Sequence, residues 1–197
     1  MQSAPEIVTK ERELNSLSLL TVSVVLATVT MTFGAIIAVF VIRSQAPLFW
    51  GPLKIPGILW VTTAVLFASS ATFDTARRKL ARNDQHRFFL WTAWTAGLGL
   101  LFLAGQLTAW FQILHAGVVL TRNPHTWFIF LFSGLHGLHI VVGLAGLGYL
   151  LVRTRFPASG PRYQMKTRII TNGVSVFWHY LDFVWIVLFV LLLTWRR

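Results

Sequence analysis

Residues 17–42 read LSLLTVSVVLATVTMTFGAIIAVFVI, a stretch without a charged side chain. About 20 apolar residues in a helix span the roughly 30 Å hydrocarbon core of a bilayer, so this stretch is long enough to cross a membrane. Four further apolar stretches of comparable length follow in the 197-residue chain, and the last of them is interrupted by a single charge, Asp182. The sequence therefore predicts an all-α membrane protein, a bundle of five transmembrane helices.

The composition agrees with a membrane protein. Of the residues, 55% are hydrophobic and 12% are charged, and the mean hydropathy is +0.66. A soluble domain has about 25% charged residues, so the composition disfavours a water-soluble globule. The formal net charge is +11, but the basic residues lie between apolar runs rather than on one polar face. We therefore expect them to face anionic lipid from cytoplasmic loops, and we expect no nucleic-acid partner. Because Cys is absent, disulfides and iron–sulfur clusters are excluded.

The expected organisation is an N-terminal cytoplasmic segment, residues 1–16, followed by one membrane domain, residues 17–197. The mixed charges of the first segment argue against a cleaved signal peptide. Of the 17 Lys and Arg, twelve lie in the N-terminal segment and the second and fourth loops. The positive-inside rule then places the N-terminus in the cytoplasm and, after five spans, the C-terminus outside. The expected spans are about 17–42, 55–75, 88–112, 126–152 and 172–195.

Four polar residues lie deep in the last two spans. His136 and His139 are three residues apart on the fourth span, and His179 and Asp182 repeat that spacing on the fifth. Residues three apart share one helix face, and antiparallel neighbours can bring the two pairs to similar depth. A carboxylate in the bilayer core costs about 2.5 to 3.5 kcal/mol, so Asp182 is expected to face protein and to find a donor among the three histidines.

Three interpretations of these residues stay open from spacing alone. They can be structural, with imidazoles and the carboxylate bonding across helices. They can ligate a metal or haem; His125 and His139 give one possible ligand pair, but His179 has no second histidine on its own helix. They can also form a proton relay, as intramembrane ionisable groups often do.

Several motifs resemble one family. Residues 177–185, FWHYLDFVW, resemble the YWHFVDVVW signature of subunit III of the haem-copper oxidases. Residues 133–139, SGLHGLH, followed by Gly143, resemble the family's TGLHGLHV..G helix, and residues 101–110, LFLAGQLTAW, are similar to its LFLGLQLYEW segment. Residues 69–72, SSAT, are similar to its SSVT. The motifs occur in the family's order over nearly the whole chain.

The resemblance implies a non-catalytic core subunit of a terminal oxidase, in the short five-span form, in the inner membrane of a bacterium. In this family the haem and copper belong to other subunits, so no cofactor or metal is expected in this chain. The implied partners are the catalytic subunit, other oxidase subunits and membrane phospholipids. The implied role is to pack against the catalytic subunit, to hold lipid, and to support proton uptake and durable turnover in aerobic electron transport.

The resemblance also nominates residues. It implies a structural polar cluster of Gln106, His136, His139, His179 and Asp182, and packing or interface roles for Trp110, Trp178 and Trp185. No catalytic residue is implied. The basic second loop adds three candidates for contact with lipid headgroups, Arg77, Arg78 and Arg82.

The chain also departs from the family pattern. Family glutamates are replaced by Val29, Ala109 and Asn172, and a family histidine by Asp74, so roles of those carboxylates are not carried over. Three other functions stay open: a haem b membrane anchor of another electron-transfer complex, a subunit of a nitric oxide reductase-type complex, and a small transporter. A haem spectrum would reveal the anchor, whereas the inverted repeat of many transporters is missing.

Overall fold

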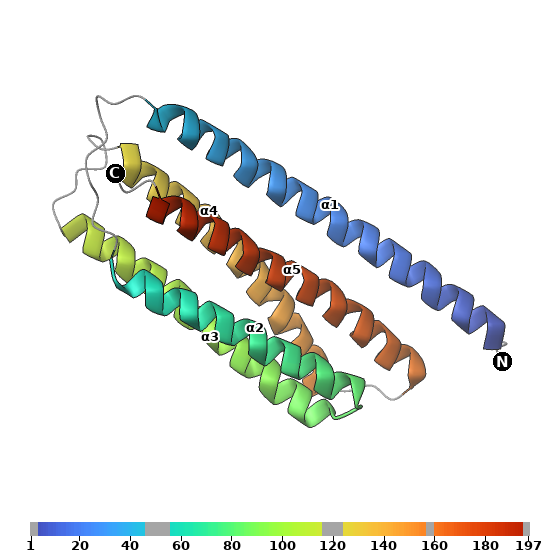
Figure 1. The fold of residues 1–197 in the computed structure, drawn as a ribbon. Helices are drawn as coiled ribbons and strands as arrows, with labels where there is room; N and C mark the ends of the chain where they lie inside the picture. The colour runs from blue at the N-terminus through green and yellow to red at the C-terminus, as the bar shows by residue number, and fades with distance from the viewer. Residues whose placement is uncertain (1–3, 46–55, 116–123, 157–159, 195–197) are drawn as a thin grey trace.

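The computed structural model describes residues 4–45, 56–115, 124–156 and 160–194, and these form five long α-helices and no strand. All five are long and apolar enough to cross a membrane, which confirms the expected fold class. Figure 1 shows them as a bundle in which α1 lies along one side. Their bounds are α1 Ala4–Ser44, α2 Ile58–Ala81, α3 Gln85–His115, α4 Pro124–Arg155 and α5 Pro161–Thr194.

The helices extend beyond the expected spans. Helix α1 runs without a break from Ala4, through the segment expected to precede the membrane, and α5 begins at Pro161 rather than near residue 172. The apolar run marks only the segment of the helix that lies inside the bilayer core. The helix itself continues into polar sequence, because its backbone hydrogen bonds do not require apolar side chains. The α2–α3 turn, the end of α4 and the start of α5 lie at the end of the bundle where α1 begins, and α5 ends at the opposite end (Figure 1).

The core of the bundle is centred on Trp178 of α5, which is fully buried. Its indole Nε1 donates to Ser69 Oγ of α2 at 3.2 Å. The ring lies where Gly99 of α3 and Gly143 of α4 lack side chains; a Cβ at either glycine would come within 2.9 Å of an indole carbon. Trp178 thus lies against α2, α3 and α4, and both glycines are required by this close approach.

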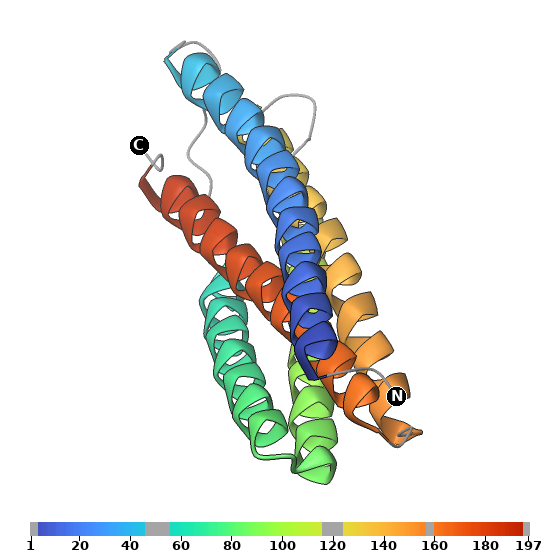
Figure 2. The same ribbon diagram turned by 90° about the vertical axis from the view of Figure 1, so that its right-hand side faces the viewer.

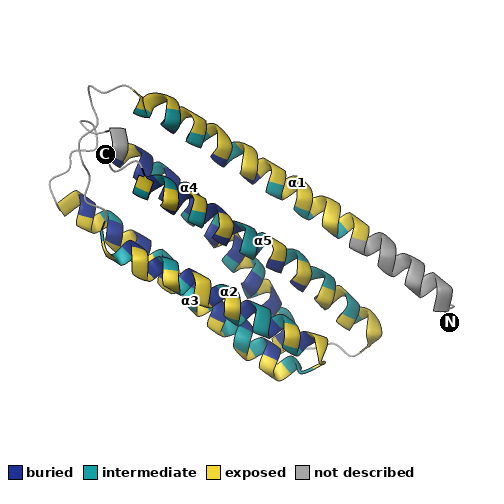
Figure 3. Ribbon diagram, viewed as in Figure 1, coloured by how far each residue is buried: buried dark blue, intermediate teal, exposed yellow. Residues whose placement is uncertain are grey.

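Helix α1 is the least buried element. Its buried residues are Val29, Phe33 and Phe40. They belong to a cluster shared with α4 and α5, in which the rings of Phe33 and Phe40 contact the α4 rings of His136, His139, Phe128 and Phe132. From residue 16 onward, most of its other residues are exposed and the remainder half-buried, as the yellow and teal of α1 in Figure 3 show. Figure 2 shows α1 crossing over α5, on the far side of α5 from α2. An apolar exposed face of this kind suits contact with lipid or another membrane subunit.

Candidate functional site

A polar network joins α2 to α5. Ser70 Oγ of α2 donates a hydrogen bond to Asp182 Oδ2 of α5 and lies 3.1 Å from His179 Nδ1. On the other side of the imidazole, His179 Nε2 lies 3.2 Å from Asp74 Oδ1 of α2. Asp182 Oδ2 itself lies 3.8 Å from His179 Nδ1, so the two carboxylates lie on opposite sides of one ring.

The spacing of these residues explains why they meet. Ser70 and Asp74 are four residues apart on α2, and His179 and Asp182 are three apart on α5, so each pair lies on one helix face. Ser70 is about 18 Å along the axis from Ile58 and about 16 Å from Ala81, which places it near the middle of α2. Asp182 is buried beside it, as the cost of a carboxylate in the bilayer requires.

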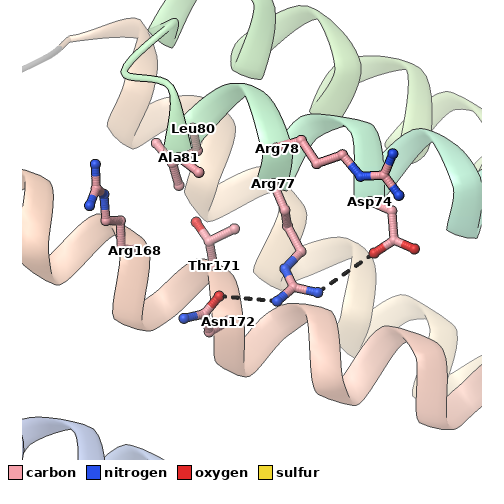
Figure 4. A pocket seen from close by; sticks show the side chains of 8 residues that line it. All are labelled: Asp74, Arg77, Arg78, Leu80, Ala81, Arg168, Thr171 and Asn172. Carbon is pink, nitrogen blue, oxygen red and sulfur yellow. Dashed lines mark hydrogen bonds and ion pairs between the residues drawn. The ribbon is translucent and has the colours of Figure 1, made fainter.

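The network continues toward one end of the bundle. Arg77 Nη1 lies 3.6 Å from Asp74 Oδ1, and Arg77 Nη2 donates to Asn172 Oδ1 of α5 at 3.4 Å. These residues border a pocket of about 480 Å³ between α2 and α5, which we call the arginine pocket. Figure 4 shows Arg77 reaching from α2 to Asn172. The pocket is lined by Asp74, Arg77, Arg78, Leu80, Ala81, Arg168, Thr171 and Asn172.

His136 and His139 lie apart from this network. His136 is fully buried among aromatic rings, with centroids 5.1 Å from Trp185 and 5.7 Å from Phe102. Among the described residues neither of its ring nitrogens has a hydrogen-bond partner. His139 Nδ1 lies 2.7 Å from the carbonyl oxygen of Leu135, one turn earlier on α4. Only His179 of the three histidines contacts Asp182.

Gln106 belongs to a third group. Its Nε2 donates to Thr62 Oγ1 of α2 at 3.3 Å, and its Oε1 is buried without a partner among the described residues. The structure thus divides the five residues of the expected polar cluster into three places: His179 with Asp182, the two α4 histidines, and Gln106. The shared helix faces brought each pair together, but the sequence did not show which face pointed to which neighbour.

The three tryptophans each bridge two helices through the indole N–H. Trp110 Nε1 donates to Ser133 Oγ at 2.8 Å, joining α3 to α4, and Trp185 Nε1 donates to Thr63 Oγ1 at 3.0 Å, joining α5 to α2. Trp178 makes the same kind of bridge from α5 to α2, and Trp178 and Trp185 are both fully buried in the chain.

The three arginines expected to contact lipid headgroups do not lie in one place. Arg77 and Arg78 line the arginine pocket, whereas Arg82 does not. Arg82 follows the last turn of α2, where its backbone N–H donates to the carbonyl oxygens of Arg78 and Lys79. The third arginine in the pocket lining is Arg168 of α5, which was not among the sequence candidates.

Sequence reasoning missed Ser70 and Asp74. The apolar runs single out Asp182 as the acidic residue within a span, whereas the structure also places Asp74 inside the 24-residue helix α2. The available signal was the four-residue spacing of Ser70 and Asp74, which puts a hydroxyl and a carboxylate on one face of an otherwise apolar span. His125, the possible second haem ligand, lies in a part of α4 whose side chains are outside the described residues.

The chemistry available to the network is hydrogen bonding between helices. In the described part of the chain no group of three or more His, Cys, Asp or Glu is placed to hold a metal ion. Around His179 the reason is geometric, because the imidazole separates the two carboxylates. The polar side chains of the network instead satisfy one another's hydrogen bonds in a region where lipid would offer no donor or acceptor.

Comparison with known proteins gives the family. Residues 26–197 match the family model described as cytochrome c oxidase subunit III. The chain is 31% identical over 165 residues to cytochrome c oxidase subunit 3 of Synechocystis sp., covering 80% of this chain and 66% of that protein. It is 32% identical over 168 residues to the probable cytochrome c oxidase subunit 3 of Nocardia farcinica, covering 81% and 78%. It is 30% identical over 136 residues to cytochrome bo(3) ubiquinol oxidase subunit 3 of Pseudomonas aeruginosa, covering 69% and 63%. This chain belongs to the cytochrome c oxidase subunit III family, whose members are non-catalytic subunits of haem-copper oxidases.

Proposed function

We propose that the chain packs against the catalytic subunit of a bacterial cytochrome c or quinol oxidase in the inner membrane and keeps the complex intact during turnover. Haem and copper are bound by the partner subunits in this proposal. The observation that carries it is the pairing of Ser70, Asp74, His179 and Asp182 with one another. The ionisable groups at membrane depth on α2 and α5 are used to join two helices of the bundle, which is a structural role.

Phospholipid is the second partner in this proposal. A groove of about 410 Å³ lies between α1 and the α4–α5 pair, with Val22 and Val25 on one side and Phe177 on the other. Gly143, Gly146 and Gly173 supply no side chains to fill it. Because the groove is apolar and lies on membrane-spanning helices, a phospholipid acyl chain suits it.

The experiment compares the purified complex with and without this chain. An affinity tag on the chain should recover the catalytic subunit and its haem spectrum. In a strain without the gene, the oxidase should show an initial oxygen consumption per haem close to that of the complete complex, followed by faster loss of activity during turnover. Resupply of the wild-type chain provides the control.

Two results would contradict the proposal. Recovery of the tagged chain without any haem-copper subunit would remove the proposed partner. Equal activity and equal durability of the complexes with and without the chain would remove the proposed role, even if the chain were bound.

A further inference from the structure

The arginine pocket carries more positive charge than its own residues neutralise. Its lining contains three guanidinium groups, from Arg77, Arg78 and Arg168, and one carboxylate, from Asp74. That carboxylate is shared, because Asp74 Oδ1 contacts both Arg77 and His179. The pocket therefore has a surplus of cationic donors around a volume of about 480 Å³.

The hydrogen bonds of these arginines leave donors unused. Arg168 Nη2 donates at 2.9 Å to Asn83 Oδ1, which is a neutral amide oxygen. Arg77 Nε is buried and has no partner among the described residues. Among the described residues, the side chain of Arg78 makes no hydrogen bond or ion pair, and Arg78 is exposed. A guanidinium presents five N–H donors in a planar fork, which matches the oxygens of a phosphate group.

The pocket is also held in shape from two helices. Arg77 and Arg78 come from the last turns of α2, while Arg168 and Asn172 come from the first turns of α5 (Figure 4). Asn172 accepts from Arg77, and Asn83 fixes Arg168 from the turn after α2. Arginines from both helices thus line one volume, and this volume lies at the ends of membrane-spanning helices, the level of lipid headgroups.

We propose that the arginine pocket binds a phosphate group, with Arg78 and Arg168 as its main charged ligands. Two sources share this chemistry: the headgroup of an anionic phospholipid, and a soluble phosphate ester. The phospholipid source deepens the lipid part of the proposed function and rests on it, whereas the soluble source does not. The site is distinct from the apolar groove beside α1, because none of the residues lining the pocket lines that groove.

The test uses the assembled oxidase complex after removal of bound lipid. The lipid probe is dioctanoyl phosphatidylglycerol, counted by native mass spectrometry; the soluble probe is glycerol 3-phosphate, titrated by calorimetry. The variants are Arg78→Gln and Arg168→Gln. Arg77 is left unchanged because it bonds both to Asp74 and to Asn172, whereas Arg168 has the single bond to Asn83 and Arg78 has none among the described residues. Arg82→Gln is the matched control, since Arg82 is a basic neighbour outside the pocket.

We expect each pocket variant to weaken binding of one probe by about 10-fold to 100-fold, the effect of losing a hydrogen bond to a charged group. Arg82→Gln should weaken it less than about 5-fold, as expected for one basic residue acting through the surface field. If phosphatidylglycerol shows this pattern, the ligand is a lipid; if only glycerol 3-phosphate shows it, the ligand is soluble. Where a Gln variant does not assemble, the corresponding Lys variant is used, and its weakening should be smaller but still exceed that of the control.

The inference is overturned if neither probe distinguishes the pocket variants from Arg82→Gln. It is also overturned if neither probe binds the wild-type complex above a complex lacking this chain. Subunit retention and initial oxygen consumption are measured on the same samples. Loss of probe binding in an intact, active complex tests only the phosphate site. Equal durability of the complexes with and without the chain tests only the proposed function.

Discussion

Replacement of Asp182 by leucine should loosen the bundle more than replacement by asparagine. In the structure Asp182 is buried and accepts a hydrogen bond from Ser70, and its Oδ2 lies 3.8 Å from His179 Nδ1. Leucine removes the acceptor and leaves these donors in an apolar seam, at a cost of about 1 to 3 kcal/mol. Asparagine keeps an oxygen acceptor for Ser70 and loses only the charge, at a cost of less than about 1 kcal/mol.

The assay measures two quantities on the same purified complexes. The first is the ratio of this chain to the catalytic subunit, which reports retention. A cost of 1 to 3 kcal/mol corresponds to a factor of about 5 to 150 in an equilibrium, so Asp182→Leu should reduce retention visibly and Asp182→Asn only slightly. The second is the initial oxygen consumption per haem, which should persist in both variants because no electron passes through this chain.

Ser70→Ala supplies the matched control. If Ser70 and Asp182 stabilise the bundle through their mutual hydrogen bond, the double variant Ser70→Ala with Asp182→Leu should lose little more retention than Asp182→Leu alone. Additive losses would show that the two residues act separately. Immediate loss of oxygen consumption in a fully assembled Asp182→Asn complex would refute the structural reasoning and assign the carboxylate to proton movement.

Three further outcomes follow from the sequence and the core. Reporter fusions near Arg162 should be cytoplasmic and fusions at the C-terminus should be external; the opposite result reverses the expected orientation. His136→Ala and His139→Ala should leave the haem content per assembled complex unchanged, whereas loss of one haem would support the haem b interpretation. Gly143→Ala should destabilise the bundle by about 1 to 3 kcal/mol, because its methyl group meets a buried indole at 2.9 Å. Gly148→Ala on the same helix, with no atom within 4 Å, should be neutral in thermal unfolding of the complex.

Much of the site could be anticipated from helical spacing. The three-residue step from His179 to Asp182 predicted that these two residues share a face, and the structure places both on the side of α5 that meets α2. The same reasoning applied to Ser70 and Asp74 would have completed the network. Spacing could not show that His136 contacts aromatic rings instead, because that depends on which neighbour its face meets.

The sequence by itself determined the number of helices and the family. Both depend on local properties: an apolar run of sufficient length must form a helix in a bilayer, and the motifs at residues 133–139 and 177–185 are contiguous. Only the tertiary structure decided the partners across helices. It placed Trp178 between two glycines, paired His179 with Asp74, and put Arg168 rather than Arg82 in the arginine pocket. The physical reason is that the rotation and depth of each helix are set by how its side chains fit against those of all neighbouring helices. These contacts come from several segments at once, so one segment of sequence does not determine them.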